Sequence, residues 1–143
     1  MDYWQRLKHL NLQSLQRRRE RYSLIHMWKT YQKLVPNDIN VQFYDNKRLG
    51  IKIKVPKYCN SATTAAANAY ESSFAIRGAK LWNTLPHEVN SQCTLSSFKI
   101  ALGKFLDTFP DTPPTKGYVA VNRNSLLAWT TQAGGCRLLQ RPC

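Results

Sequence analysis

The sequence predicts an α+β fold that is mainly α. We expect a long N-terminal helix, a small basic β-hairpin, a strand–turn–short helix, a closing amphipathic helix and a weakly ordered tail. Residues 24–35 and 95–109 carry apolar side chains at helical spacing, and residues 51–55 alternate apolar residues with lysine. At 143 residues one domain is the default. We place a single domain at 1–118 and the tail at 119–143.

Two helices are expected at the N-terminus. Residues 2–10 predict a short helix with Leu7 and Leu10 on one side, and Asn11 is a suitable cap before a longer helix over 12–35. Pro36 ends that helix. Its second half carries an apolar stripe that we expect in the core: Leu24, Met27, Trp28, Tyr31, Leu34 and Val35.

The period changes after residue 40. Ile51 and Ile53 alternate with lysines, which predicts a half-buried strand with a basic outer face. Val41 and Phe43 are expected to form its partner strand, with a turn at 45–47. Residues 60–72 are small and polar and are interpreted as a surface loop.

The segment 73–89 is the most distinctive in the chain. Residues 73–77 predict a short strand, Gly78 a pivot, and the following residues one or two helical turns that stop at Pro86. The closing helix begins after Thr94, a good N-cap. Its stripe is expected to pack on the first one, and it consists of Leu95, Phe98, Leu102, Phe105, Leu106 and Phe109.

The charge of the chain predicts a polyanionic partner. Its 21 Lys and Arg outnumber its 8 Asp and Glu, which gives a net charge of +13. A basic excess of this size favours nucleic acid, because phosphate contacts release counterions. A membrane surface fits less well, because the basic stretches lack a purely apolar opposite face. We therefore expect a nucleic-acid partner and no membrane.

The first candidate contact group is an arginine cluster in the long helix. Its four members point almost all round a helix, so we expect them to face water or phosphate, and arginine suits bidentate phosphate contact. The alternative is a solvated basic helix start. The members are Arg17, Arg18, Arg19 and Arg21.

Two further groups carry basic candidates. The hairpin group is Lys47, Arg48, Lys52, Lys54 and Lys57. Lysines on an edge strand also protect against aggregation, and this interpretation is as good as phosphate binding. The third group is Arg77 and Lys80. Trp82 beside them is compatible with base stacking, but its spacing favours the core, so we expect Arg77 or Lys80 to reach outward.

The sequence gives little support for catalysis. There is no adjacent acidic pair, no phosphate-binding glycine loop and no nucleophile elbow. The histidines at 9, 26 and 87 have no metal-ligand spacing, so we assign this chain no catalytic residue, metal or cofactor. The four scattered cysteines predict free thiols in a reducing compartment. The alternative is a structural disulfide, which would need an oxidising setting that nothing else in the sequence indicates. With no apolar run or leader, we expect an intracellular protein, in nucleus or cytoplasm.

Four blocks in fixed order carry a family resemblance. They are Leu7, Leu10, Leu12 and Leu15 leading into residues 17–22 (RRRERY) and 27–29 (MWK), residues 74–86 (FAIRGAKLWNTLP), residues 95–106, and residues 110–113 with 117–118 and 124–129. Together they resemble the C-terminal part of non-LTR retrotransposon reverse transcriptases, the segment that follows the polymerase palm. The similarity runs from about Tyr3 to Trp129.

The resemblance implies a thumb-like region that grips the template–primer while the palm does the chemistry. The partners would be an RNA template, a DNA primer or their hybrid, and the remainder of the polymerase. The whole enzyme would be an RNA-directed DNA polymerase, with magnesium only in the missing palm, so this chain is expected to be inactive alone. The alternatives are a self-standing basic RNA- or DNA-binding protein, a protein-interaction module, and a non-functional retroelement remnant.

Overall fold

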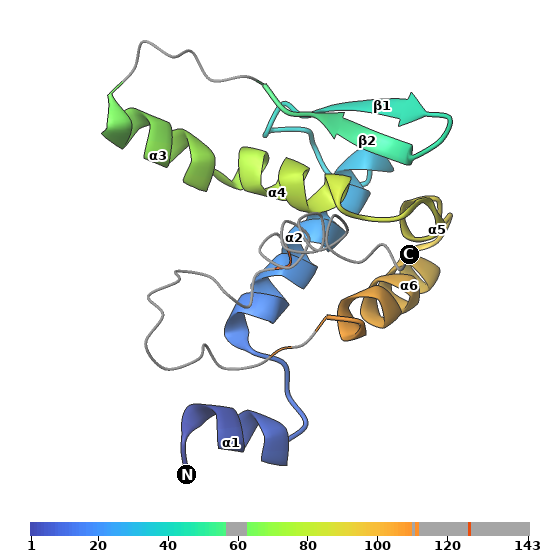
Figure 1. Ribbon diagram of the computed structural model, residues 1–143. Helices are drawn as coiled ribbons and strands as arrows, with labels where there is room; N and C mark the ends of the chain where they lie inside the picture. Colours follow the sequence, from blue (N-terminus) through green and yellow to red (C-terminus); the bar gives the residue numbers. More distant parts are fainter. Residues whose placement is uncertain (57–62, 110, 112–125, 127–143) are drawn as a thin grey trace, which may run out of the picture.

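The fold is α+β and mainly helical, as the sequence predicted (Figure 1). The computed structural model describes residues 1–56, 63–109, 111 and 126. The expected tail at 119–143 therefore lies outside the described residues, apart from Leu126. In chain order the elements are α1 Tyr3–His9, α2 Leu15–Tyr31, β1 Gln42–Asn46, β2 Gly50–Lys54, α3 Thr64–Ser72, α4 Phe74–Asn83, α5 His87–Asn90 and α6 Leu95–Asp107.

The first two helices begin at side-chain caps. Asp2 and Gln5 form a reciprocal capping box at the start of α1. The predicted cap Asn11 instead forms the bend between the helices, with φ 51°, a conformation that a short polar side chain tolerates. Ser14 caps α2 by accepting the Arg17 amide. Helix α2 therefore begins at Leu15 rather than residue 12.

The stripe of α2 is buried except at its end. Leu24, Met27 and Trp28 are buried, whereas Leu34 is 63% exposed. Helix α2 ends at Tyr31, and Lys33 takes φ 58°, so Leu34 no longer follows the helical phase. The expectation that Leu34 belongs to the core is wrong for this reason.

The hairpin forms where it was expected, with a later turn. Strands β1 and β2 are antiparallel, and Tyr44 lies opposite Lys52 in the register. The loop is 47–49 rather than 45–47, because the Asn46 side chain accepts the amides of Arg48 and Leu49. Gly50 closes it with φ 77°.

Two predictions between residues 60 and 83 are wrong. Residues 64–72 form α3, whose alanines favour a helix and whose start is capped by Thr63. Residues 73–77 are not a strand, because α4 runs unbroken through Gly78. A Cβ at Gly78 would overlap the Met27 Cε, so this glycine lets α4 approach α2 closely instead of forming a pivot.

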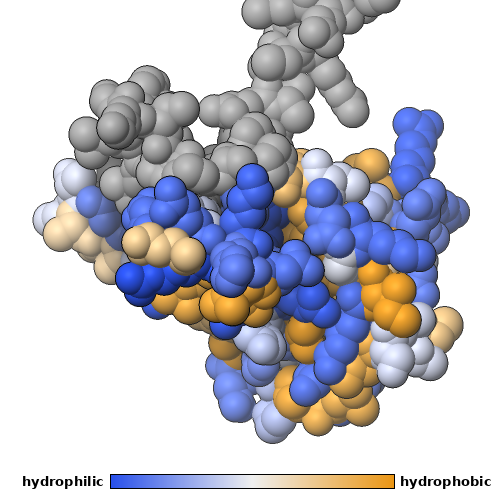
Figure 2. Space-filling view, turned by 90° about the horizontal axis from the view of Figure 1, so that it is seen from below, coloured by the Kyte–Doolittle hydropathy of each residue, from blue (hydrophilic) through white to orange (hydrophobic). Residues whose placement is uncertain are grey.

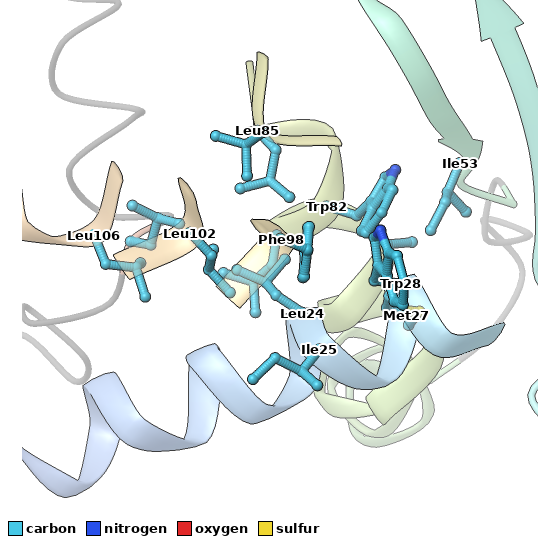
Figure 3. Close-up of a cluster of buried hydrophobic side chains, with 14 of the residues drawn as sticks. Leu24, Ile25, Met27, Trp28, Ile53, Trp82, Leu85, Phe98, Leu102 and Leu106 are labelled. Carbon is cyan, nitrogen blue, oxygen red and sulfur yellow. The ribbon is translucent and has the colours of Figure 1, made fainter. Parts of the chain in front are cut away.

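The core confirms that the two apolar stripes pack on each other (Figure 3). Phe98 of α6 stacks on Trp28 of α2 at 5.4 Å between ring centroids, and on Trp82 of α4 at 6.1 Å. Leu81 and Leu85 are buried in the same cluster. Helix α6 begins after Thr94 as predicted. Within the described ranges, no helix is long and apolar enough to span a bilayer.

Candidate nucleic-acid interface

The arginine cluster divides between the two sides of α2. Arg17 and Glu20 are only 1% and 3% exposed, whereas Arg18 and Arg19 are exposed. Residues 17, 20, 21 and 24 fall on one side at 3.6 residues per turn, and this side packs inward. The expectation that every arginine of the cluster faces water or phosphate is therefore wrong for Arg17.

Arg17 joins the start of α2 to the end of α6. Its Nη1 donates to the Leu106 carbonyl at 3.4 Å, and a cation is favourable at a helix C-terminus. Beside it, the amide and hydroxyl of Ser14 both donate to the Asp111 carboxylate, each at 2.6 Å. Asp111 therefore connects the start of α2 to the segment that follows α6.

Glu20 holds Leu126, which belongs to the segment 119–143 that we expected to be a tail. Its two carboxylate oxygens accept the Leu126 amide at 3.1 and 3.0 Å. Leu126 is fully buried in the core cluster. Leu127 and Trp129 lie outside the described residues.

The remaining arginines define an outward surface. Arg21 is partly buried, and its guanidinium passes near Gly103 of α6. On the opposite side Tyr22 is 68% exposed, one helical turn after Arg18 and Arg19. We call Arg18, Arg19 and Tyr22 the arginine–tyrosine face. Sequence reasoning did not single out Tyr22 as an exposed residue beside the two arginines, although its spacing from them and its position away from the apolar stripe indicate it.

The hairpin group divides in the same way. Lys47, Arg48 and Lys54 are exposed, but Lys52 is 8% exposed and its Nζ donates to the carbonyls of Asn83 and Leu85 at 2.9 and 3.0 Å. Burial lowers the pKa of Lys52. The predicted basic outer face is therefore wrong for Lys52, and Lys57 lies outside the described residues.

Lys52 turns inward because β2 lies against the end of α4 and the turn after it. The Asn83 amide accepts from the Ile53 amide at 2.8 Å and donates to the Ile53 carbonyl at 2.9 Å. Trp82 Nε1 and Asn90 Nδ2 both donate to the Ile51 carbonyl, at 2.9 and 3.0 Å. These side chains provide hydrogen-bond partners for the main chain of β2 on the edge that does not pair with β1.

The third group behaves as predicted. Trp82 is fully buried, and Arg77 is exposed on α4. Lys80 forms an ion pair with Glu71 of α3, so its charge is compensated locally. Arg77 is therefore the outward cation of this segment.

Among the described residues, the arginine–tyrosine face and the exposed cations of the hairpin form separate surfaces. The hairpin packs at the C-terminal end of α2, where Tyr31 and Phe43 lie 5.2 Å apart between ring centroids. Arg19 lies twelve residues earlier, about 18 Å along the helix axis.

Figure 2 shows one face of the molecule, on which hydrophilic side chains predominate and hydrophobic patches lie between them.

The described residues hold no group of three His, Cys, Asp or Glu placed to bind a metal ion. Cys93 is a free, exposed thiol, and the other three cysteines lie outside the described residues. Comparison with protein-family models, curated proteins and solved structures finds no match to the chain. The family assignment therefore remains a proposal that rests on the sequence motifs.

Proposed function

We propose that this chain binds nucleic acid and is the thumb-like region that follows the palm in a non-LTR retrotransposon reverse transcriptase. The observation that carries the binding proposal is the arginine–tyrosine face. Arg18 and Arg19 stand beside an exposed aromatic ring on the outward side of α2, while the other side of that helix packs into the core.

This face offers two kinds of contact. Guanidinium groups form bidentate hydrogen bonds with phosphate, and an exposed tyrosine ring stacks on bases without regard to sequence. Lys47, Arg48, Lys54 and Arg77 add exposed positive charge elsewhere, and a net charge of +13 attracts a polyanion from any direction.

The role we propose is binding of the template–primer rather than catalysis. The chain would hold an RNA template, a DNA primer or their hybrid, and magnesium and the catalytic aspartates would belong to the palm. The remainder of the polymerase would be its protein partner, in the nucleus or the cytoplasm.

A second candidate, a protein-interaction module, is favoured by one observation. Leu10, Leu12 and Leu15 are exposed around the junction of α1 and α2. A partner that covers these side chains would bind through apolar contact, with little dependence on salt. Salt dependence therefore separates the two candidates.

The test is a charge-removal variant with a matched control. Arg18→Gln/Arg19→Gln removes two exposed charges, and Arg17 stays unchanged because it holds the fold. Lys99→Gln/Lys104→Gln removes two exposed charges from α6. Fluorescence anisotropy over a salt series would compare both variants on a DNA duplex and on an RNA–DNA hybrid of the same sequence.

We expect the arginine variant to bind more weakly and to lower the magnitude of the duplex salt slope by about 1–2, since each phosphate contact contributes about 0.9. The control should keep a slope close to that of the parent. Equal slopes in both variants would reject the arginine–tyrosine face as the interface.

A further inference from the structure

A pocket of about 600 Å³ lies between the hairpin and the turn after α4. The hairpin contributes Tyr44, Arg48, Leu49 and Lys52, and the turn contributes Pro86 and His87. The roles described so far, the arginine–tyrosine face and the hydrophobic core, do not explain this pocket. Its walls combine basic, aromatic and apolar side chains.

The charge of this pocket is suited to an anion. Arg48, Lys52 and His87 line it, and no carboxylate belongs to its described lining. Lys52 is fixed there, because two of its donors are held by the carbonyls of Asn83 and Leu85. An ammonium has three donors, so one remains for an acceptor.

An aromatic side chain stands beside this cation. Tyr44 is directly opposite Lys52 in the hairpin register, so both side chains lie on the same face. Tyr44 and Leu49 are about half exposed, at 49% and 57%. A half-exposed ring next to fixed positive charge can stack on a base whose phosphate the cations hold.

Gly50 places His87 at this pocket. A Cβ at Gly50 would come within 2.8 Å of the His87 ring and of the Asn90 Oδ1. Because Gly50 has no side chain, the His87 imidazole can lie against the end of the hairpin loop, two residues after Arg48. The loop and the turn together place Arg48 and His87 on the same pocket.

We propose that this pocket binds a single unpaired nucleotide, with its base on Tyr44 and its phosphate between Arg48, Lys52 and His87. The inference deepens the proposed function, on which it rests, since the nucleotide would belong to a bound strand. The site is nevertheless separate from the arginine–tyrosine face.

The experiment is an NMR titration of the chain with adenosine monophosphate, with adenosine and with inorganic phosphate. We expect the monophosphate to shift the Tyr44, Arg48 and His87 signals saturably, and each half-ligand to bind more weakly. Arg48→Gln should weaken monophosphate binding by about tenfold through the lost charged contact. Tyr44→Phe should retain binding and Tyr44→Leu should not. Lys99→Gln, an exposed change on α6 away from this pocket, is the control.

Three results would overturn the proposal. They are the absence of saturable shifts, phosphate alone binding as tightly as the nucleotide, and Arg48→Gln binding like the parent. Failure of the proposed function is distinguishable, because Arg18→Gln/Arg19→Gln must leave monophosphate binding unchanged. Binding of the monophosphate without arginine-dependent duplex binding would support the pocket and reject the arginine–tyrosine face as the interface.

Discussion

The side-chain amide of Asn83 pairs with the main chain of Ile53 as a neighbouring strand would. It accepts from the Ile53 amide at 2.8 Å and donates to the Ile53 carbonyl at 2.9 Å. Asn83 belongs to the segment 74–86 that carries the family resemblance. This part of the segment therefore contributes to folding, since it completes the edge of a two-stranded sheet.

Asn83→Ala should destabilise the chain by about 2–4 kcal/mol, because it leaves two partly buried main-chain groups without partners. Urea unfolding measures this loss. Asn68→Ala, on the exposed side of α3, is the control and should stay within about 0.5 kcal/mol of the parent. Equal effects of the two substitutions would show that the pairing contributes nothing to stability.

Alanine at two glycines should act in opposite directions. At Gly50 the backbone has φ 77°, which costs an alanine about 1–2 kcal/mol, and the new Cβ would also crowd His87 and Asn90. At Gly103, within α6, a Cβ meets only Arg21 Nη1 at 3.9 Å, so alanine should stabilise by about 0.5–1 kcal/mol. Thermal unfolding of both variants checks the signs, and a stabilising Gly50→Ala would contradict the hairpin geometry.

Lys52 should make stability depend on pH in the alkaline range. Its folded-state pKa is lowered below the ordinary 10.5 by desolvation. Between the folded-state pKa and 10.5, the unfolded chain therefore binds more protons than the folded chain. Stability increases as pH rises through that window. Below the folded pKa both states are protonated and this increase is absent.

The variant Lys52→Met removes this titration. The unfolding free energy of the parent minus that of the variant should grow as pH rises from the folded-state pKa of Lys52 towards 10.5. Urea unfolding at successive pH values measures this difference. Lys54→Met, at an exposed position on the same strand, should give a difference that changes much less. A constant difference for Lys52→Met would mean that its ammonium is not desolvated.

Phe98→Asp should abolish cooperative unfolding. Phe98 is fully buried between two tryptophans, so the substitution places a carboxylate without a partner in the core. Ile100→Asp, on the same helix at 61% exposure, should unfold like the parent. Circular dichroism melts distinguish the two, and a parent-like melt for Phe98→Asp would refute the core assignment.

The sequence predicted features that depend on local pattern. The stripes around Leu24 and Phe98 follow helical period, and Thr94 is a suitable cap, so both helices and their contact were predictable. The α4 region was misinterpreted because Gly78 has two uses, as a pivot and as a point of close approach. Only the position of Met27 shows which one applies.

The candidate site was less predictable because its inward residues depend on distant partners. Arg17 turns inward towards a carbonyl 89 residues away, and Ser14 meets a carboxylate 97 residues away. Lys52 reaches carbonyls 31 and 33 residues away. Charge counting treats every basic residue as a surface residue and cannot identify these exceptions, whereas exposed Arg18, Arg19 and Arg77 needed no such partner.

The most direct test of the central claim is to map the nucleic-acid contact by NMR. A short RNA–DNA hybrid would be titrated into the isotope-labelled chain, with amide, arginine and tyrosine side-chain signals followed. We predict the largest shifts at Arg18, Arg19 and Tyr22, with Lys99 and Lys104 of α6 little affected. Shifts concentrated on α6, or no saturable shift at all, would contradict the proposed interface.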